Sequence, residues 1–206
     1  MIMIFLTSNG LTSEALQNEF KTAILNKGNH CAIIPTAMEK DKDHAEWLTQ
    51  TKINLEQYGL DCDYFYFGQQ ENEKLYDYDV IYICGGNVFY LMQMIKQCCA
   101  EEVLRKVALE KIIVGVSAGS LIMQKDLELI RDLIPRMNKR VKLKDLTALD
   151  ITNNIEHLPH KTRYIGIIDA FEKRVKTHER KVGHKVICLE DGQGIIIDGD
   201  SHKIIE

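Results

Sequence analysis

The sequence predicts an α/β fold: a three-layer sandwich in which helices cover both faces of one mostly parallel sheet. Short apolar runs typical of buried strands alternate with segments of helical periodicity through the first half of the chain. Two of these runs stop abruptly at glycine-rich turns, Gly85-Gly86 and Gly115. Strands separated by helices of this length are typical of parallel βαβ units. The C-terminal end adds a predicted β-hairpin.

The first half supplies most of the expected sheet. The opening apolar run ends at the turn-forming Thr7-Ser8-Asn9-Gly10, and Ser13 is a suitable N-cap for the helix that follows. The later strands are β-branched or aromatic runs bounded by polar turns. In chain order we expect strands at residues 1–7, 30–35, 61–67, 79–84 and 111–114. The helices expected between them cover residues 13–27, about 43–57, and two segments around 91–95 and 103–107.

The second half is less regular. Residues 126–149 mix short apolar steps with basic side chains, so we expect a surface segment there, with a substrate-facing role as the alternative for the basic stretch 131–144. Helical spacing returns at 165–178. The predicted hairpin pairs residues 185–189 with 194–198 around Asp191-Gly192, and Asp198-Gly199 is a further turn signal before 203–205.

Composition limits the classes of function. The chain has 206 residues, which favours a single domain over residues 1–206, and its 45% hydrophobic content is enough for a full core. A net charge of -4 argues against nucleic acid or an anionic membrane as partner. No apolar run approaches the ~20 residues of a membrane helix, and no signal core is visible. The six cysteines form no CxxC pair. We therefore expect a cytoplasmic monomer or homodimer that needs no metal or cofactor.

The stretch Gly115-Val116-Ser117-Ala118-Gly119 after an apolar strand is the most informative feature. Small residues allow a tight strand-to-helix turn that exposes the serine hydroxyl at the carboxyl end of the sheet, as in a nucleophile elbow. The alternative is a glycine-rich turn that carries an inert serine. Acyl transfer also needs a base, an acid that orients the base, and donors for the oxyanion.

Gly85-Gly86-Asn87 ends the strand expected beside the elbow strand. Glycine lets backbone amides approach a ligand, so an amide of this block and that of Ala118 are candidate oxyanion donors. Asn87 is a candidate for substrate contact. The structural alternative is a plain turn with Asn87 as a helix cap.

The residues alone offer more than one candidate for the base and for the acid. Seven histidines are present, and His160 is favoured because it follows Pro159 at a predicted strand end, with His157 as the fallback. Three carboxylates compete for the orienting role: Asp132, Asp126 and Glu128.

Together these blocks resemble peptidase family S51, which includes dipeptidase E (aspartyl dipeptidase) and cyanophycinase. Gly85-Gly86-Asn87-Val88-Phe89-Tyr90-Leu91, the Ser117 block and the downstream Pro159-His160 occur in the family's order, and the resemblance extends over essentially the whole chain. It implies a fold akin to class I glutamine amidotransferases (flavodoxin-like), with serine replacing their cysteine.

The resemblance also implies roles for individual residues. Ser117 would be the nucleophile, His160 the base, and Asp132 the orienting acid; the amides of Gly86 and Ala118 would form the oxyanion hole, with Gly85 shaping the turn. Two positions depart from the family's pattern: Arg131 stands where the dipeptidase branch has asparagine, and Lys161 where an aromatic residue is usual.

The implied activity is hydrolysis of short peptides through an acyl-enzyme on Ser117. The sequence leaves open whether an N-terminal aspartate is required. Two alternatives remain: an amidotransferase-like hydrolase of a non-peptide amide or ester, and a non-catalytic family member that acts as a binding module.

Overall fold

In the computed structural model of the chain, residues 3–38 and 45–206 are described. Within them, a seven-stranded sheet has the order β3-β2-β4-β5-β1-β8-β9. The first five strands in this order are parallel, whereas β8 runs antiparallel to both β1 and β9. The strands are β1 (Met3–Thr7), β2 (His30–Ile34), β3 (Asp61–Tyr64), β4 (Val80–Ile83), β5 (Ile112–Val116), β8 (Gly194–Asp198) and β9 (Ser201–Ile205).

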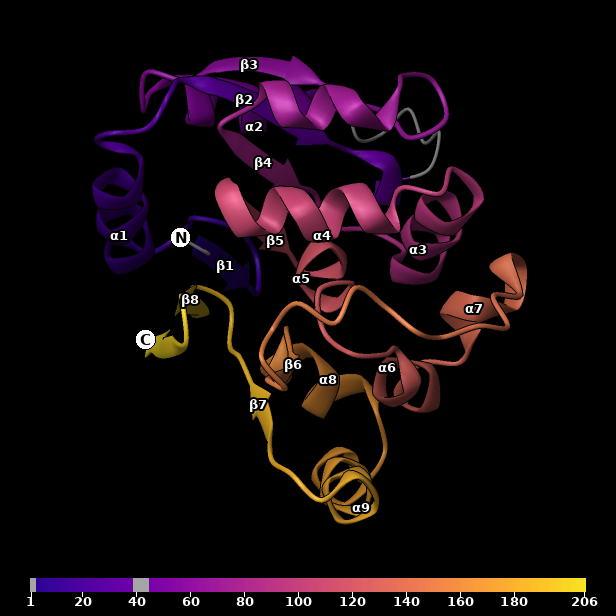
Figure 1. The fold of residues 1–206 in the computed structure, drawn as a ribbon. Coiled ribbons are helices and arrows are strands. Elements are labelled where there is room, and N and C mark those ends of the chain that lie inside the picture. Colours follow the sequence, from indigo (N-terminus) through magenta and orange to yellow (C-terminus); the bar gives the residue numbers. More distant parts are fainter. Residues whose placement is uncertain (1–2, 39–44) are drawn as a thin grey trace.

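Helices lie on both faces of this sheet (Figure 1). In chain order they are α1 (Glu14–Ile24), α2 (Ala45–Glu56), α3 (Val88–Gln97), α4 (Glu101–Glu110), α5 (Ala118–Leu121), α6 (Glu128–Leu133), α7 (Arg136–Val141), α8 (Lys161–Ile167) and α9 (Phe171–Val182). Ser13 caps α1 as predicted, because its side chain accepts a hydrogen bond from the Leu16 amide. The start of the helix expected at about 43–57 lies outside the described residues.

Each face of the sheet carries its own hydrophobic cluster. On one face, Phe20 of α1 and Leu55 of α2 pack against buried side chains of the central strands. Phe89 of α3 and Leu104 of α4 belong to the larger cluster on the other face. Strand residues alternate between the two clusters, as Ile113 and Val114 of β5 do. This arrangement confirms the predicted three-layer α/β sandwich with a mostly parallel sheet.

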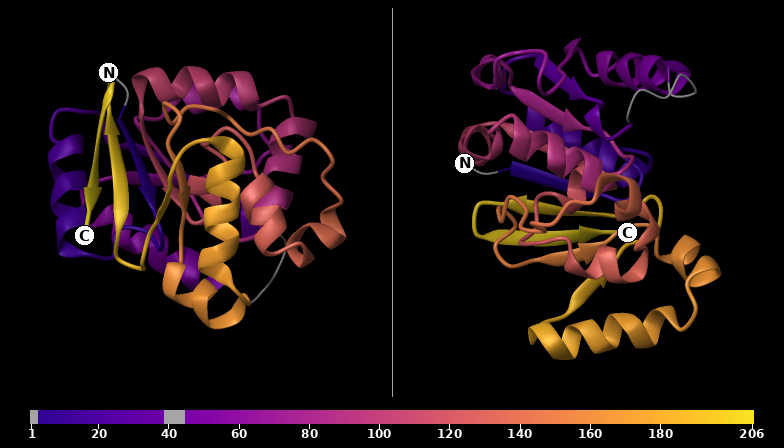
Figure 2. Two further views of the ribbon diagram at one scale, coloured as in Figure 1. Left: turned by 90° about the horizontal axis from the view of Figure 1, so that it is seen from below. Right: turned by 90° about the vertical axis from the view of Figure 1, so that its right-hand side faces the viewer.

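The C-terminal hairpin is formed by different strands from those predicted. β8 pairs antiparallel with β9 around Asp198-Gly199 (Figure 2, left), so that turn signal marks the hairpin. β7 (Val186–Cys188) instead pairs in parallel with β6 (Glu156–Leu158) in a separate two-stranded sheet. The pairing of 185–189 with 194–198 is therefore wrong, because the segment between them returns the chain to the edge of β1 rather than making a tight turn.

Two further expectations need correction. Residues 126–149 are not only a surface segment: α6 buries Leu129, Ile130 and Leu133, because these apolar residues recur at helical spacing behind its charged side chains. The helix expected at 165–178 is two helices, α8 and α9, which break where Ala170 adopts a left-handed conformation (φ 51°). Figure 2 (right) shows α9 at the end of the molecule far from α2.

Three parallel strands end beside one another and position the site. β5 lies between β4 and β1, so the residues that follow these strands meet at one edge of the sheet. They are Ser8 after β1, Gly85 after β4 and Ser117 after β5. Crevices in open α/β sheets occur at this carboxyl edge.

Candidate active site

Ser117 occupies a sharp, strained turn between β5 and α5. Its backbone has φ 51° and ψ −106°, outside the regions that non-glycine residues normally adopt. The Ser117 N–H donates to the Thr7 carbonyl of β1 at 2.9 Å, and the Ser117 carbonyl accepts the amides of Ser120 and Leu121. Hydrogen bonds on both sides therefore hold the strained residue in place.

Small residues allow this turn to pack against its neighbours. A Cβ added at Gly119 would lie 2.2 Å from the Ile83 carbonyl oxygen of β4, and one at Gly115 would lie 2.7 Å from the Gly119 carbonyl oxygen. Both distances are far below van der Waals contact, so only glycine fits. The helix that begins after Ser117 is short, since α5 has four residues.

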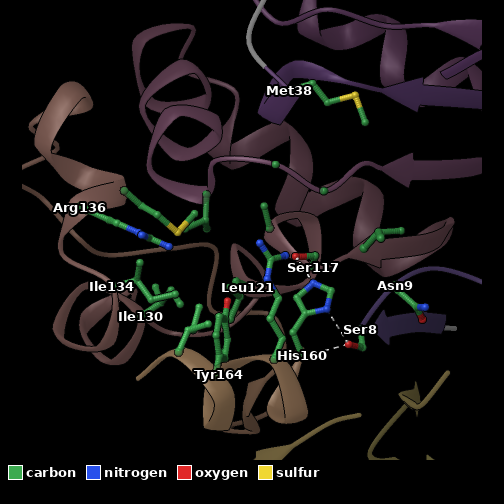
Figure 3. A pocket seen from close by; sticks show the side chains of 18 of the residues that line it. Ser8, Asn9, Met38, Ser117, Leu121, Ile130, Ile134, Arg136, His160 and Tyr164 are labelled. Carbon is green, nitrogen blue, oxygen red and sulfur yellow. Dashed lines mark hydrogen bonds between the residues drawn. The ribbon is translucent and has the colours of Figure 1, made fainter. Parts of the chain in front are cut away.

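Ser117, His160 and Asp191 form a continuous hydrogen-bonded chain. The Ser117 Oγ lies 2.9 Å from His160 Nε2, and His160 Nδ1 lies 2.6 Å from Asp191 Oδ1. Figure 3 shows the imidazole of His160 between Ser117 and Ser8. Because an ionised carboxylate only accepts, Nδ1 carries the proton and Nε2 presents its lone pair to the serine hydroxyl. This is the tautomer that a general base requires.

The segment around His160 is fixed by three contacts. Its amide donates to Ser8 Oγ at 2.9 Å, and the next amide, that of Lys161, donates to the Leu189 carbonyl at 2.9 Å. His160 itself adopts a left-handed backbone (φ 60°, ψ 40°) at the start of α8, directly after Pro159. The ring of Tyr164, one turn later, lies edge-on to the imidazole at 6.3 Å between centroids.

Asp191 is held by two donors. Ser8 Oγ donates to Asp191 Oδ1 at 2.7 Å, and His160 Nδ1 donates to the same oxygen. Burial alone would raise the pKa of Asp191, but the hydrogen bonds from Ser8 and His160 and the charges of His160 and Arg163 outweigh it and lower that pKa. Asp191 is therefore ionised at neutral pH, as an orienting acid must be.

None of the three carboxylates expected beside the histidine hydrogen-bonds to it. Asp132 Oδ1 accepts from Arg131 at 2.7 Å, Glu128 pairs with Lys181 at 2.5 Å, and Asp126 accepts the Glu128 amide at 2.9 Å. The assignment of Asp132 as the orienting acid is contradicted by this geometry. The physical reason is that these carboxylates, in α6 or just before it, pair with their own neighbours and with α9, whereas the loop between β7 and β8 returns to the end of β1.

His157, the fallback base, does not reach Ser117 by a hydrogen bond. It is fully buried, and its Nε2 lies 2.9 Å from Ser120 Oγ. Burial lowers the pKa of His157 to about 3. Of the two histidines, the structure brings only His160 into hydrogen-bond contact with Ser117.

The predicted oxyanion donors lie close to Ser117. A Cβ on Gly85 would lie 3.3 Å from the Ser117 Cβ, and one on Gly86 (φ 139°) would lie 2.2 Å from the Ala37 carbonyl oxygen. Within the described part of the chain, the amides of Gly86 and Ala118 have no intramolecular acceptor. Both residues line the same cavity as Ser117, so their amides are available to a ligand.

Asn87 has a structural position instead. Its Oδ1 accepts the amides of Phe89 and Tyr90 at the start of α3, and its Nδ2 donates to the Met137 carbonyl at 3.2 Å. It is not among the residues that line the cavity. The structure therefore gives the Asn87 side chain a capping role and does not place it in the cavity, contrary to the expected substrate contact.

Sequence reasoning missed Asp191 and Ser8. The sequence predicts turns at Asp191-Gly192 and at Ser8, and assigns neither residue a role in the site. Their positions relative to the strands could have indicated a role in the site: Ser8 follows β1, and Asp191 lies between β7 and β8, close to the same edge of the sheet. Polar residues that follow parallel strands converge at this edge.

Ser117 and His160 open into a cavity of about 560 Å³. One wall is apolar, and we call it the apolar wall; it consists of Leu121, Ile130, Ile134, Met137, Tyr164 and Ile167. Figure 3 shows its labelled members on the opposite side of Ser117 from Ser8 and Asn9. Arg136 and Arg163 also line the cavity, so the basic stretch 131–144 contributes one side chain to it.

Across residues 3–38 and 45–206, no group of three or more histidine, cysteine, aspartate or glutamate side chains is arranged to hold a metal ion. Over the same residues, no helix has the length and apolarity needed to cross a bilayer.

Fold and site together define an α/β protein with a serine–histidine–aspartate constellation at the carboxyl edge of its sheet. The sequence profile of peptidase family S51 matches residues 4–205, and the chain belongs to that family.

Individual relatives agree with this placement. An uncharacterized peptidase of Listeria innocua is 26% identical over 210 residues, covering 93% of this chain and 94% of its own. One of Listeria monocytogenes is 29% identical over 164 residues, covering 76% and 77%.

Two solved structures share the fold. A Listeria monocytogenes protein assigned as a peptidase E superposes with a TM-score of 0.72 at 26% identity, covering all of this chain and 98% of its own. A peptidase from an acI-B1 Actinobacterium gives a TM-score of 0.71 at 16% identity over all of this chain and 88% of its own, which supports the fold alone.

Proposed function

We propose that this peptidase is a serine peptidase that hydrolyses short peptides through an acyl-enzyme on Ser117. The observation that carries the proposal is the hydrogen-bonded chain from Ser117 Oγ through His160 to Asp191, at 2.9 and 2.6 Å. Nucleophile, base and orienting acid within hydrogen-bond reach are the signature of activated serine hydrolases.

The proposed acylation has two proton transfers. Ser117 Oγ attacks the carbonyl carbon of the scissile amide while its proton passes to His160 Nε2. The amides of Gly86 and Ala118 stabilise the oxyanion of the tetrahedral intermediate. The C–N bond then breaks as His160 returns the proton to the leaving nitrogen, which releases an amine and leaves an ester on Ser117.

Deacylation reverses these roles. A water molecule attacks the ester carbonyl and gives its proton to His160, and the Ser117 oxygen leaves and takes the proton back. The products are a carboxylic acid and free enzyme. Asp191 stays ionised throughout and holds Nδ1–H, which stabilises the imidazolium formed in each step.

The 2.9 Å approach of His160 to Ser117 argues against a non-catalytic binding module, whose histidine would stand away from the serine. A non-peptide amide or ester remains chemically compatible with the same residues. Only the compound that is hydrolysed distinguishes such an activity from peptide hydrolysis, and family membership favours a peptide.

The test is hydrolysis of a dipeptide library by the purified protein, followed by amine release. We expect turnover that Ser117→Ala abolishes and that Ser201→Ala, on the exposed strand β9, leaves intact. Peptide hydrolysis that survives Ser117→Ala would refute the nucleophile, and turnover of simple esters and amides but of no peptide would favour the non-peptide alternative.

A further inference from the structure

Arg163 is a charged side chain of the cavity at Ser117 that the proposed reaction does not use. It lines the cavity with Ser117 and lies in α8, three residues after His160, which immediately precedes that helix. Both residues line the same cavity, so the guanidinium and the imidazole can contact one ligand. Within the described part of the chain Arg163 has no salt-bridge partner. Its charge lowers the pKa of Asp191, but the hydrogen bonds of that carboxylate come from His160 and Ser8, so the guanidinium can still bind a ligand.

His160 is the group that protonates the leaving nitrogen under the proposed function. In a peptide whose leaving group is one amino acid, that nitrogen is two bonds from the α-carboxylate carbon. The carboxylate therefore lies on the His160 side of the scissile bond. Guanidinium groups bind carboxylates through two parallel hydrogen bonds, which fixes both position and orientation.

We propose that Arg163 binds the C-terminal α-carboxylate of the substrate, so that the enzyme releases single C-terminal residues from short peptides. This inference rests on the proposed function. It names the substrate class: peptides with a free C-terminal carboxylate directly after the scissile bond. The apolar wall suits an apolar side chain beside that bond, so leucine-containing peptides are appropriate probes.

The experiment compares Xaa-Leu dipeptides with the same peptides as C-terminal amides. A hydrogen-bonded charge pair contributes roughly 1.5–3 kcal/mol, so we expect the wild type to prefer the free acid by about 10- to 150-fold in kcat/KM. Arg163→Gln should remove this preference, with Arg163→Lys intermediate. Arg180→Gln, which removes an exposed arginine of α9 away from the cavity, should keep it.

Two outcomes would overturn the inference alone: equal hydrolysis of acid and amide by the wild type, or a preference that persists in Arg163→Gln. In both cases Ser117 would still react with a fluorophosphonate. A protein that cleaves neither form and whose Ser117 does not react would instead overturn the proposed function, and this inference with it.

A different observation concerns the buried pair His157 and Ser120. Ser120 Oγ donates to the Ser117 carbonyl at 2.8 Å and lies 2.9 Å from His157 Nε2. The Nδ1 atom of His157 has no hydrogen-bond partner among the described residues. A proton on Nδ1 would be a buried, unpaired donor, so the proton is on Nε2 and is donated to Ser120 Oγ.

This chain of two hydrogen bonds joins the nucleophile to the segment that carries the base. His157 precedes His160 by three residues, and the His157 amide is itself tied to Gln124 Oε1 at 3.2 Å. The geometry points to His157 as a positioning residue that sets the distance between Ser117 and His160 by acting through Ser120. It does not contact substrate, since neither His157 nor Ser120 lines the cavity.

Substitutions that keep or remove the Nε2 donor test this role. We expect His157→Met to lower kcat about 10-fold or more with KM within twofold, because a misplacement of about 1 Å can cost as much as 100-fold. His157→Gln, whose amide nitrogen can replace Nε2–H, should restore most of kcat. Ser120→Ala, a small change that keeps the packing, should reproduce the loss.

A wild-type kcat in both His157→Met and Ser120→Ala would overturn the positioning role. So would a Gln variant no more active than the Met variant when thermal unfolding shows both to be folded. The split between kcat and KM matters here, because general loosening of the core would affect substrate binding as well.

Discussion

Asp191 shows how a single hydrogen-bond partner decides the interpretation of a site. Unlike Asp132, Asp126 and Glu128, it hydrogen-bonds to His160, and Ser8 donates to the same carboxylate oxygen. Asp132 is bound instead to Arg131. Distance along the sequence from Ser117 is a poor guide to the orienting acid, because hydrogen bonds across the fold select the carboxylate that binds His160.

Asp191→Asn is expected to lower kcat/KM by roughly 10²–10⁴-fold, because an amide cannot hold His160 in the Nδ1–H tautomer or stabilise the imidazolium. The matched control is Asp132→Asn, which removes the same charge from α6 and should change activity by less than twofold. Steady-state kinetics on one dipeptide measures both. The reverse ranking would restore Asp132 as the orienting acid.

At the scale of elements, the elbow depends on the close approach of α5 to β4. Gly119 brings the α5 backbone against the Ile83 carbonyl, and the order β4-β5-β1 places three strand ends beside one another. The sheet therefore acts as a rigid frame for the nucleophile, and the frame tolerates no side chain at that contact.

Gly119→Ala is expected to destabilise the protein by about 1–3 kcal/mol or more, since the added Cβ meets backbone that cannot yield. Gly166→Ala is the control: it lies in α8, and nothing lies within 4 Å of its added Cβ. That change should be neutral or stabilise by about 0.5–1 kcal/mol through helix propensity. Urea denaturation compares the two. Equal stabilities would contradict the close-packing account.

The elements that could be predicted are those specified by local pattern. β1, β2, β4 and β5 are continuous apolar runs that end at turn residues, and the elbow and Gly85-Gly86 follow from glycine's role in such turns. β6 and β7 have three residues each and pair across about thirty residues of chain. A strand was predicted at 185–189, but no local pattern indicates that it pairs with β6. The Ser117–His160 pairing was predictable, whereas Asp191 depended on where the loop after β7 returns.

At the scale of the whole molecule, a buried neutral histidine makes folding sensitive to acid. His157 is fully buried, and burial lowers its pKa to about 3, compared with about 6.5 in an unfolded chain. Between these values the unfolded state binds a proton that the folded state excludes. Stability is then complete above pH 6.5 and is lost as pH falls.

The expected contribution is a loss of about 1.4 kcal/mol per pH unit between pH 6.5 and 3. Because carboxylates also titrate near the lower limit, the informative quantity is the difference between wild type and His157→Gln, which keeps a hydrogen bond but does not titrate. Chemical denaturation at several pH values gives both curves. Parallel curves above pH 4.5 would contradict the buried neutral state of His157.

The central claim is that Ser117 is a nucleophile activated by His160 and Asp191. Its most direct test is the site of covalent labelling by a fluorophosphonate, located by mass spectrometry of proteolytic fragments. The account predicts a single adduct on Ser117, formed at least 100-fold more slowly in Asp191→Asn and absent in Ser117→Ala. An adduct on another residue, or a fully folded protein in which Ser117 stays unlabelled, would contradict it.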